Sequence, residues 1–257
     1  MKNRPIGVFD SGVGGLSVLH EARRILPREN FLYYGDNIHA PYGMKSPEDI
    51  LLLTLNAADF LLKKGVKALL VACNTATSVA INRLRSENDM PVISMEPAVK
   101  PALRFLSGGK VLVLATPATL SQGRYLRLIE KIGGTDCVIN LPCPGLAELV
   151  ETHDFEAPEI YDYLHNAFAP IAKEPVQAIV LGCTHYVFLR HAVTQAAGAY
   201  WNGLPVLDGH MGTALHLKHV LERRGLLKLC GTGSAEYYSS GDVRVFERFI
   251  SSSVQKS

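Results

Sequence analysis

The sequence predicts an α/β fold made of two similar domains, each built on an open parallel sheet. Short apolar runs of strand length alternate with longer segments of helical periodicity, which is typical of β-α-β units. The chain has 257 residues, a length that favours two domains over one. The segment 68–75 is similar to the segment 178–185, and this repeat indicates an internal duplication.

The first half of the chain contains three predicted strands and one well-marked helix. The strands are residues 5–9, 31–35 and 67–72. Ser46 and Pro47 supply an N-cap and a first helical residue, and Gly65 supplies a stop, so the sequence predicts a helix over 47–64. We expect this helix to lie on the sheet through an apolar face made of Leu51, Leu52, Leu55, Ala58 and Leu62.

The second half repeats this pattern. Strands are predicted at 111–114 and 178–181, and helical segments near 121–132, 156–172 and 186–197. The turn at Asp10 is matched with the turn at Thr116, and Cys73 with Cys183. Prolines and glycines near 97–101 and 203–209 mark the crossovers, so the predicted domains are 1–97 plus 209–257, and 98–208.

Composition excludes several classes of protein. Lys and Arg number 26 and Asp and Glu 24, a balance that favours neither a nucleic-acid nor a membrane partner. Five cysteines without a Cys-x-x-Cys pair fit neither a disulfide framework nor a zinc ribbon, and they indicate a reducing, cytoplasmic location. We expect no metal site, because no carboxylate or cysteine completes a set with His210, His216 and His219.

Two cysteines follow predicted strands at the edge where ligands gather in parallel sheets. Cys73 precedes Asn74 and Thr75, and Cys183 precedes Thr184, so each is followed by a residue able to cap a helix. The positive end of a helix dipole favours thiolate, which predicts reactive cysteines. The alternative for either one alone is a small buried hydrophobe, which is how we interpret the other three cysteines: Cys137, Cys143 and Cys230.

Further polar residues are expected at the same strand ends. The loop 10–15 (DSGVGG) would let backbone approach a ligand, but its spacing is not that of a dinucleotide fingerprint, and a tight turn explains the glycines equally well. His185 is two residues from Cys183 and is either its proton-transfer partner or an ordinary surface histidine.

Four motifs taken together resemble one known family. They are residues 7–16 (GVFDSGVGGL), 34–36 with 41–43 (YGD and PYG), 71–76 (VACNTA) and 181–186 (LGCTHY). This set resembles the cofactor-independent aspartate/glutamate racemases, and in particular glutamate racemases, over nearly the whole chain. The resemblance implies two α/β domains related by pseudo-symmetry, with the active site in the cleft between them.

The resemblance also implies a reaction and its residues. Cys73 and Cys183 would transfer protons in the interconversion of L- and D-glutamate, without a cofactor, to supply D-glutamate for peptidoglycan; a homodimer is compatible with it. The implied substrate-binding residues are Asp10, Ser11, Tyr42, Gly43, Asn74, Thr75, Thr184 and His185, with supporting roles for Asp36, Thr116 and Glu151. The sequence departs from the family pattern at Ala115, Val187 and Gly209.

Inversion at an α-carbon favours two bases over one. A proton leaves one face and another arrives at the opposite face, and a duplicated fold offers one thiol for each.

Three alternative functions stay open. They are racemisation of aspartate or a related acid, a hydrolase with a Cys183/His185 nucleophile, and a protein that binds an acidic metabolite without turnover.

Overall fold

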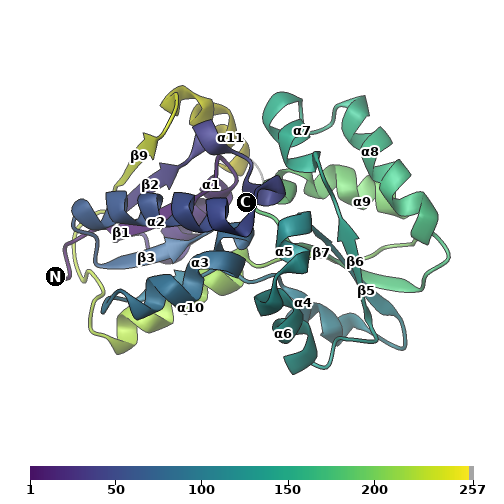
Figure 1. Cartoon of the computed structure of the whole chain (residues 1–257), viewed down its shortest axis with the longest axis horizontal. Helices are drawn as coiled ribbons and strands as arrows, with labels where there is room; N and C mark the ends of the chain where they lie inside the picture. The colour runs from purple at the N-terminus through teal and green to yellow at the C-terminus, as the bar shows by residue number, and fades with distance from the viewer. Residues whose placement is uncertain (255–257) are drawn as a thin grey trace. The chain divides into compact units, whose positions relative to one another are not determined.

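The computed structural model describes residues 1–254 and divides them into two compact units (Figure 1). Unit 1 comprises Met1–Glu96 and the segment that begins at His210, and unit 2 comprises Pro97–Gly209. The expected domain boundaries, after residues 97 and 208, each differ from these bounds by one residue. Within residues 1–254, no helix combines the length and the apolar character needed to cross a bilayer.

Unit 1 is built on a five-stranded parallel sheet in the order β4-β3-β1-β2-β9. The three strands predicted for this half are confirmed to within one residue. The sheet adds two short strands that the sequence did not indicate. The bounds are β1 (Ile6–Asp10), β2 (Phe31–Gly35), β3 (Ala68–Val71), β4 (Val92–Ser94) and β9 (Ala235–Ser239).

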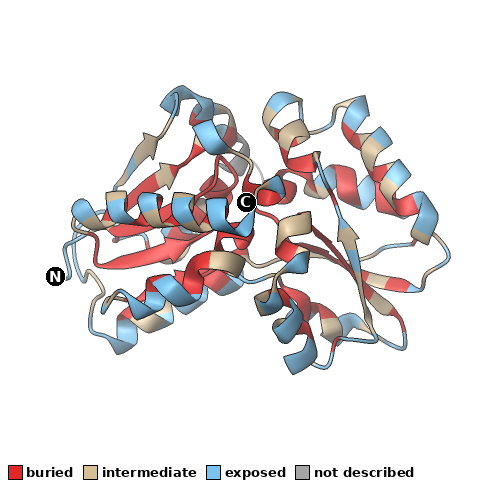
Figure 2. Ribbon diagram, in the orientation of Figure 1, coloured by how far each residue is buried: buried red, intermediate tan, exposed pale blue. Residues whose placement is uncertain are grey.

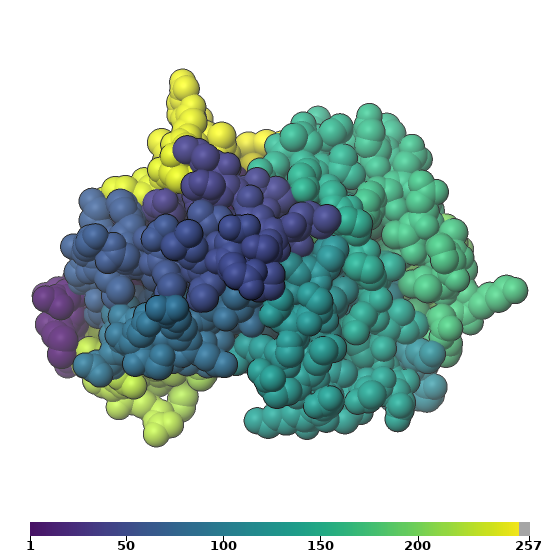
Figure 3. Space-filling model, in the orientation of Figure 1, coloured from purple at the N-terminus to yellow at the C-terminus, as the bar shows by residue number. Residues whose placement is uncertain are grey.

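Helices cover both faces of this sheet. One face carries α2 (Pro47–Lys63) and α3 (Asn74–Ser86), which pack against each other; α1 (Gly15–Ile25) packs against α10 (His210–Arg223) and α11 (Phe246–Val254). Three short 3-10 helices complete the unit: η1 (Asn37–His39), η2 (Tyr42–Met44) and η6 (Val243–Val245). Figure 2 shows β1, β2 and β3 largely buried and the outer helix faces exposed, and in Figure 3 the chain from about 210 onward is visible at the upper and lower margins of unit 1, beside its N-terminal part.

The predicted helix 47–64 is confirmed, but its predicted apolar face is only partly right: Ala58 is buried as expected, whereas Leu52 is not. Ser46 caps α2 by accepting a hydrogen bond from the Asp49 backbone N–H, as its sequence suggested. Leu52 is 59% exposed, whereas Leu61 is completely buried. The reason lies in Gly7 on β1: a Cβ there would come within 3.3 Å of the Leu61 side chain, so the missing side chain makes room for Leu61. The buried positions of α2 are Ile50, Thr54, Ala57, Ala58 and Leu61.

The two leucines of α2 should therefore respond differently to truncation. Leu61→Ala is expected to lower the free energy of unfolding by about 2–5 kcal/mol, because it leaves a cavity over β1. Leu52→Ala should change it by less than about 0.5 kcal/mol, because the side chain is already in water. Urea titrations of both variants test this, and equal losses would show that the packing of α2 is not as described.

Unit 2 contains a four-stranded parallel sheet in the order β6-β5-β7-β8. The strands predicted at 111–114 and 178–181 are confirmed as the centre of this sheet. Its strands are β5 (Lys110–Ala115), β6 (Val138–Pro142), β7 (Val176–Leu181) and β8 (Val206–Asp208).

The helix predicted near 121–132 is confirmed as α6 (Gly123–Lys131), which Gln122 separates from the preceding α5 (Pro117–Ser121). The other two predicted helices are each broken into two pieces. In the first, α8 (Pro158–Phe168) runs into η4 (Ala169–Ile171), and in the second, η5 (His185–Leu189) precedes α9 (Arg190–Gly198). Three further helical elements were not predicted: α4 (Val99–Ala102), η3 (Leu103–Phe105) and α7 (Leu146–Thr152).

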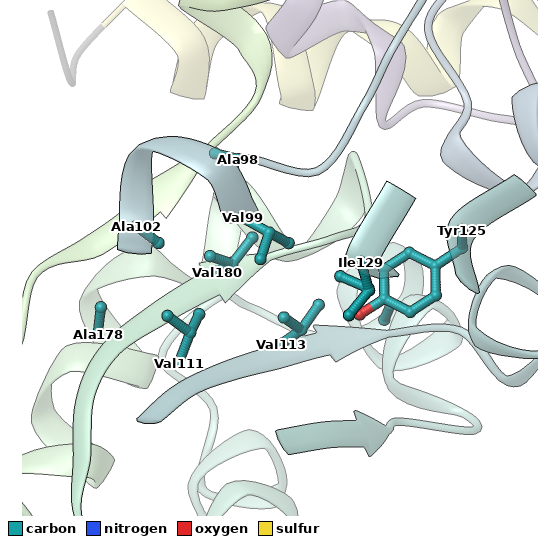
Figure 4. Packing of buried hydrophobic residues seen from close by; sticks show 10 residues of the cluster. Ala98, Val99, Ala102, Val111, Val113, Tyr125, Ile129, Ala178 and Val180 are labelled. Atoms are coloured by element: carbon teal, nitrogen blue, oxygen red, sulfur yellow. The ribbon is translucent and has the colours of Figure 1, made fainter. Parts of the chain in front are cut away.

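One face of this sheet is covered by α4 and α6. Figure 4 shows alternate residues of β5 and β7 pointing toward these helices, as the period of two along a strand requires. The cluster consists of small and β-branched side chains closed by one tyrosine: Ala98, Val99, Ala102, Val111, Val113, Ala115, Tyr125, Ile129, Ala178 and Val180.

The two sheets share one topology. Reading β5 as β1, β6 as β2, β7 as β3 and β8 as β4, the strand order is the same, with β9 as an addition. The register corrects one expected pair of equivalent residues. Phe9 pairs with Val71, and Leu114 pairs with Leu181, so Thr116 corresponds to Ser11 and not to Asp10.

A buried ion pair connects the segment near residues 226–228 with the amino-terminal edge of the unit 1 sheet. Lys67 and Glu29 have side chains that are 0% and 1% exposed. The Lys67 ammonium also donates to the carbonyls of Lys2, at 2.6 Å, and Leu226, at 2.9 Å. Glu29 accepts a second bond from the Lys228 backbone N–H. The pair therefore joins four chain segments that are distant in sequence, at Lys2, Glu29, Lys67 and residues 226–228.

Candidate active site

The predicted residues of unit 1 come together at the carboxyl edge of its sheet. Asp10 ends β1, Asp36 follows β2 and Cys73 follows β3. The Asp36 backbone N–H donates to the Asp10 carbonyl at 3.1 Å, which joins two of these strand ends. Parallel strands align their carboxyl ends, so three chemically active side chains meet at one edge.

Cys73 lies between a hydroxyl and a helix N-terminus. Its Sγ is 3.4 Å from Ser11 Oγ and accepts a hydrogen bond from the Ala76 backbone N–H at 3.4 Å. Cys73 is thus itself the N-cap of α3, which corrects the expectation that Asn74 or Thr75 would cap this helix. The dipole of α3 and the Ala76 N–H both favour the thiolate form of Cys73.

The loop after β1 is held in a tight turn by Asp10. Asp10 is completely buried, and its Oδ1 accepts a hydrogen bond from the Gly12 backbone N–H at 3.0 Å. A Cβ on Gly15 would come within 2.5 Å of the Asp10 Cβ, so this position requires glycine because of the close approach. The glycines thus serve the turn, and the turn brings Ser11 to Cys73.

Tyr42, Asp36 and His39 form a hydrogen-bonded group beside Cys73. The Tyr42 hydroxyl donates to Asp36 Oδ2 at 2.6 Å, and His39 Nδ1 lies 2.8 Å from Asp36 Oδ1. Burial raises the pKa of Tyr42, and the Asp36 carboxylate raises it further because it accepts the phenol proton. Tyr42 is therefore neutral, with its one proton committed to Asp36.

The remaining predicted residues of unit 1 also lie near this edge. Asn74 and Thr75 are buried in the first turn of α3, and Gly43 is buried in η2. The Asn74 Oδ1 is buried and has no hydrogen-bond partner among the described residues. A buried acceptor of this kind is costly unless a ligand supplies the donor.

The predicted residues of unit 2 form a chain of three groups from two elements. Cys183 follows β7, and its Sγ lies 3.9 Å from His185 Nδ1. On the other side of the ring, His185 Nε2 lies 2.8 Å from Glu151 Oε1, a residue of α7. His185 is buried, whereas the Glu151 side chain is 28% exposed. These three side chains can thus carry a proton between the Cys183 thiol and solvent.

The protonation of His185 is set by opposing effects. Burial lowers the pKa of this imidazole, but the hydrogen bonds to Cys183 and Glu151 outweigh it and hold the pKa well above its ordinary value. His185 is therefore charged at neutral pH, with Cys183 on one side of its ring and Glu151 on the other.

Glu151→Gln should lower the pKa of His185, because the neutral amide cannot stabilise the imidazolium as a carboxylate does. The folded-state pKa is raised, so the stabilisation is present below about pH 6.5 and is lost as pH rises through the folded value. The free-energy difference between wild type and variant should be largest near pH 6 and shrink toward pH 9. At its largest, this difference in the free energy of unfolding is about 1.4 kcal/mol for each tenfold increase that the substitution causes in the acid dissociation constant of His185.

NMR titration of the His185 ring in both proteins measures this directly. An unchanged His185 pKa in Glu151→Gln would show that Glu151 does not control its charge. Glu148→Gln, on the same helix, is the matched control and should leave the titration of His185 unchanged.

The element that follows Cys183 is a 3-10 helix and not the start of the regular helix that the sequence predicted. Thr184 precedes η5, a 3-10 helix of five residues, and α9 begins only at Arg190. Cys183 therefore does not lie at the N-terminus of a regular helix, whereas Cys73 does. Thr116 caps α5 by accepting a hydrogen bond from the Thr119 backbone N–H at 3.2 Å.

Comparison with known proteins gives one consistent result. A model of the Asp/Glu/Hydantoin racemase family matches residues 8–217. A glutamate racemase of Clostridium botulinum (strain Okra / Type B1) is 47% identical over 228 residues, which cover 89% of this chain and 88% of the relative. The chain belongs to the Asp/Glu/hydantoin racemase family. The relatives that it matches are racemases, so the chain is an enzyme of the isomerase class, and the resemblance drawn from the sequence is confirmed.

Solved structures of the family have the same fold. A glutamate racemase from Francisella tularensis in complex with D-glutamate is 28% identical, with a TM-score of 0.86, over 98% of this chain and 95% of that chain. A glutamate racemase from Escherichia coli in complex with L-glutamate and the activator UDP-MurNAc-Ala is 30% identical, with a TM-score of 0.81 and the same coverage. The predicted fold class, two α/β units with parallel sheets, is confirmed.

Some residues near the site in this family member were not identified from the sequence. The Tyr186 hydroxyl donates to the Cys143 carbonyl at 2.9 Å, and Cys143 is buried at the same sheet edge as Cys183. Burial first, and then the charge of Cys183, raises the pKa of Cys143 to about 12, so this thiol stays protonated. His39 was also missed, although its place three residues after Asp36 in a turn was a signal.

The three departures from the family pattern lie at buried or half-buried positions. Ala115 lies against Gly182, where an added Cβ would come within 3.0 Å of the Ala115 methyl group. Val187 and Gly209 are half-buried.

The three histidines His210, His216 and His219 lie on α10, and no set of three metal-binding side chains occurs in the described part of the chain.

Proposed function

We propose that this protein interconverts L- and D-glutamate by a two-base mechanism in which Cys73 and Cys183 transfer the α-proton. The observation that carries the proposal is the equivalent placement of the two thiols, each two residues beyond the paired strand at the carboxyl edge of its own sheet. The identity to glutamate racemases, and the complexes of two relatives with D- and L-glutamate, support the choice of substrate.

The reaction balances without any change in oxidation state. One cysteine thiolate takes the proton from Cα, and the electron pair of the broken bond delocalises into the α-carboxylate. The other cysteine, as a thiol, gives its proton to Cα on the opposite face and becomes the thiolate. The two thiols end with exchanged protonation states, and exchange with solvent restores them.

The two thiols have different local partners for this exchange. Cys183 has the His185–Glu151 chain, in which the charged imidazole stabilises the thiolate and passes a proton to a partly exposed carboxylate. Cys73 has the Ser11 hydroxyl and the Ala76 N–H. The thiolate is the form of either cysteine that accepts the α-proton.

The substrate charges are matched by groups at the same sheet edges. We assign the carboxylates to backbone N–H groups at helix starts and to the hydroxyls of Ser11, Thr75, Thr116 and Thr184. The ammonium is assigned to the Asp10 carboxylate and to the unpartnered Asn74 Oδ1. Tyr42 and Gly43 complete the binding loop. These donors also stabilise the charge that develops on the α-carboxylate.

A biosynthetic role follows from the product. We assign the D-glutamate to peptidoglycan synthesis; the E. coli relative is bound to an activator that contains N-acetylmuramic acid, a peptidoglycan sugar, which supports this role. A cytoplasmic location and a homodimer also stay predictions, and fractionation of the cells and sedimentation of the purified enzyme test them.

The test is racemisation without any added cofactor. Purified protein, dialysed against EDTA, is mixed with L-glutamate, and the circular dichroism of the amino acid is followed. We expect the signal to decay to zero. A signal that decays with L-aspartate but not with L-glutamate would show that the substrate is aspartate and not glutamate. Stabilisation of the protein by glutamate without any decay of the signal would indicate a binding protein.

A further inference from the structure

Two tyrosine hydroxyls hold the turn that leads from β6 into α7. The Tyr186 hydroxyl donates to the Cys143 carbonyl, and the Tyr163 hydroxyl donates to the Pro144 carbonyl, each at 2.9 Å. Tyr186 belongs to η5 and Tyr163 to α8, so two other elements of unit 2 hold two successive carbonyl groups of this turn. We call residues 143–145 the α7 turn.

The position of α7 depends on this turn. Gly145 precedes the helix with a positive φ of 78°, and no side chain among the described residues caps the first turn of the helix. The helix itself has only seven residues, and a helix of this length is held by its packing and not by its own hydrogen bonds. We therefore expect that a displaced α7 turn displaces the helix with it.

The helix carries the carboxylate that contacts His185. Glu151 lies near the end of α7, and its Oε1 is 2.8 Å from His185 Nε2. A contact of this kind stops being a hydrogen bond when the two heavy atoms are about 3.6 Å apart. A small movement of α7 is therefore enough to break the contact that sets the charge of His185.

The Tyr186 hydroxyl is a permanent donor. The side chain is completely buried, and burial raises the pKa of Tyr186 well above its ordinary value. The negative charge of Cys183 raises this pKa further, and Cys143, Tyr163 and Glu148 act in the same direction. The hydroxyl thus keeps its proton, and without its bond the buried Cys143 carbonyl would lose a donor that water does not replace.

Packing explains the ring of Tyr186 but not its hydroxyl. A phenylalanine would fill the same space and would bring no polar atom into the interior. The hydroxyl links η5 to the α7 turn, and η5 follows Cys183 directly along the chain through Thr184. One short segment therefore supplies the reacting thiol, the imidazole beside it and the hydrogen bond that places the partner of that imidazole.

We infer that Tyr186 is a positioning residue for racemisation: its hydroxyl holds the α7 turn and so keeps Glu151 beside His185. Tyr163 contributes less, because its hydroxyl bond lies where water can replace it. The link to catalysis rests on the proposed function, but the contact between Glu151 and His185 can be measured without turnover.

NMR titration of the His185 ring in the full chain, without substrate, tests the positioning step. Tyr186→Phe should raise the acid dissociation constant of His185 by about threefold or more, because the carboxylate moves away from the imidazolium. Tyr163→Phe should raise it in the same direction by about 1.5-fold or more, and this variant decides the test if Tyr186→Phe does not fold. An unchanged constant in the deciding variant would overturn the inference.

Tyr125→Phe is the matched control for these titrations. Tyr125 is a buried tyrosine of the same unit, and its hydroxyl donates to the Asn140 side chain and not to the α7 turn. The substitution removes the same atom from an equally buried ring, but it should leave the acid dissociation constant of His185 unchanged. A shift as large as that in Tyr186→Phe would show a general effect of lost stability and would overturn the inference.

A double variant shows whether Tyr186 acts through Glu151. The carboxylate is already absent in Glu151→Gln, so the addition of Tyr186→Phe should change the acid dissociation constant of His185 by less than about 1.5-fold. The same change in both backgrounds would show that Tyr186 reaches His185 by another route, and Glu151 would not be what it positions.

Racemisation of glutamate in both directions links this contact to catalysis. Tyr186→Phe should lower kcat by about tenfold and change KM by less than about twofold, because the hydroxyl places a proton-transfer group and not the substrate. Tyr125→Phe should keep both constants within about twofold. If the wild type racemises glutamate and Tyr186→Phe has the same kcat, the inference fails and the proposed function stands. If the wild type does not racemise glutamate but the His185 titration shifts as expected, the proposed function fails and the placement of Glu151 by Tyr186 stands.

Discussion

Cys73→Ala and Cys183→Ala are each expected to lower the rate of racemisation by about 1,000-fold or more. Each variant removes the only base proposed for one face of the α-carbon, and a positioned acid or base contributes about 100- to 10,000-fold. Loss of either one closes the route in both directions, because each cysteine acts as base in one direction and as acid in the other.

Cys137→Ala is the control for this experiment. Among the described residues, the Cys137 Sγ donates hydrogen bonds to carbonyl oxygens of its own turn, from Gly133 and Gly134, so its removal should leave the rate within about twofold. Circular dichroism in the far ultraviolet checks that all three variants fold. Near-normal racemisation by either active-site variant would contradict the two-base mechanism.

The largest effect on stability is expected from the buried pair Lys67–Glu29. Lys67→Met should lower the free energy of unfolding by about 3–5 kcal/mol, because it leaves the buried Glu29 carboxylate without its counter-charge. Lys63→Met is the matched control. Lys63 pairs with Asp59 on the surface, where both side chains are more than half exposed, and such pairs contribute at most about 1 kcal/mol.

A double variant separates the charge from the packing. Lys67→Met with Glu29→Gln removes both charges and should recover part of the loss, as is seen when a buried pair is replaced as a whole. Urea unfolding measures all of these proteins. If Lys67→Met lowers the free energy of unfolding no more than Lys63→Met does, the buried pair does not hold the segment near residues 226–228 in place.

Local signals in the sequence were sufficient for the central elements of the fold. Ser46 and Gly65 marked the ends of α2, and Gly65 indeed has a positive φ of 76°. The shorter strands were not found, because β4 and β8 have only three residues each and show no period. They are recognisable as strands only through their pairing with β3 and β7.

The orientation of α2 could not be read from its own residues. Leucines occur on several sides of this helix, and the choice among them depends on Gly7, about 50 residues earlier on β1. The cap of α3 was misjudged for a similar reason. A cysteine is an uncommon N-cap, and its role is visible only in the contact between its Sγ and the Ala76 N–H.

The candidate site was predictable to different degrees in its two halves. Residues next to strand ends, such as Ser11 and Cys73, could be placed at one edge by topology alone. The His185–Glu151 contact joins residues 34 positions apart, and only the packing of α7 near η5 brings them together. The Tyr42–Asp36 bond likewise depends on how the loop after β2 folds back.

Deuterium incorporation from solvent tests the central claim most directly. L-glutamate is converted in D2O, and both enantiomers are separated at early times and analysed by mass spectrometry. With two cysteines on opposite faces, the D-glutamate formed should carry deuterium at Cα, while the remaining L-glutamate stays protiated. Equal deuterium in substrate and product from the earliest time points would indicate a single base and would contradict the roles proposed for Cys73 and Cys183.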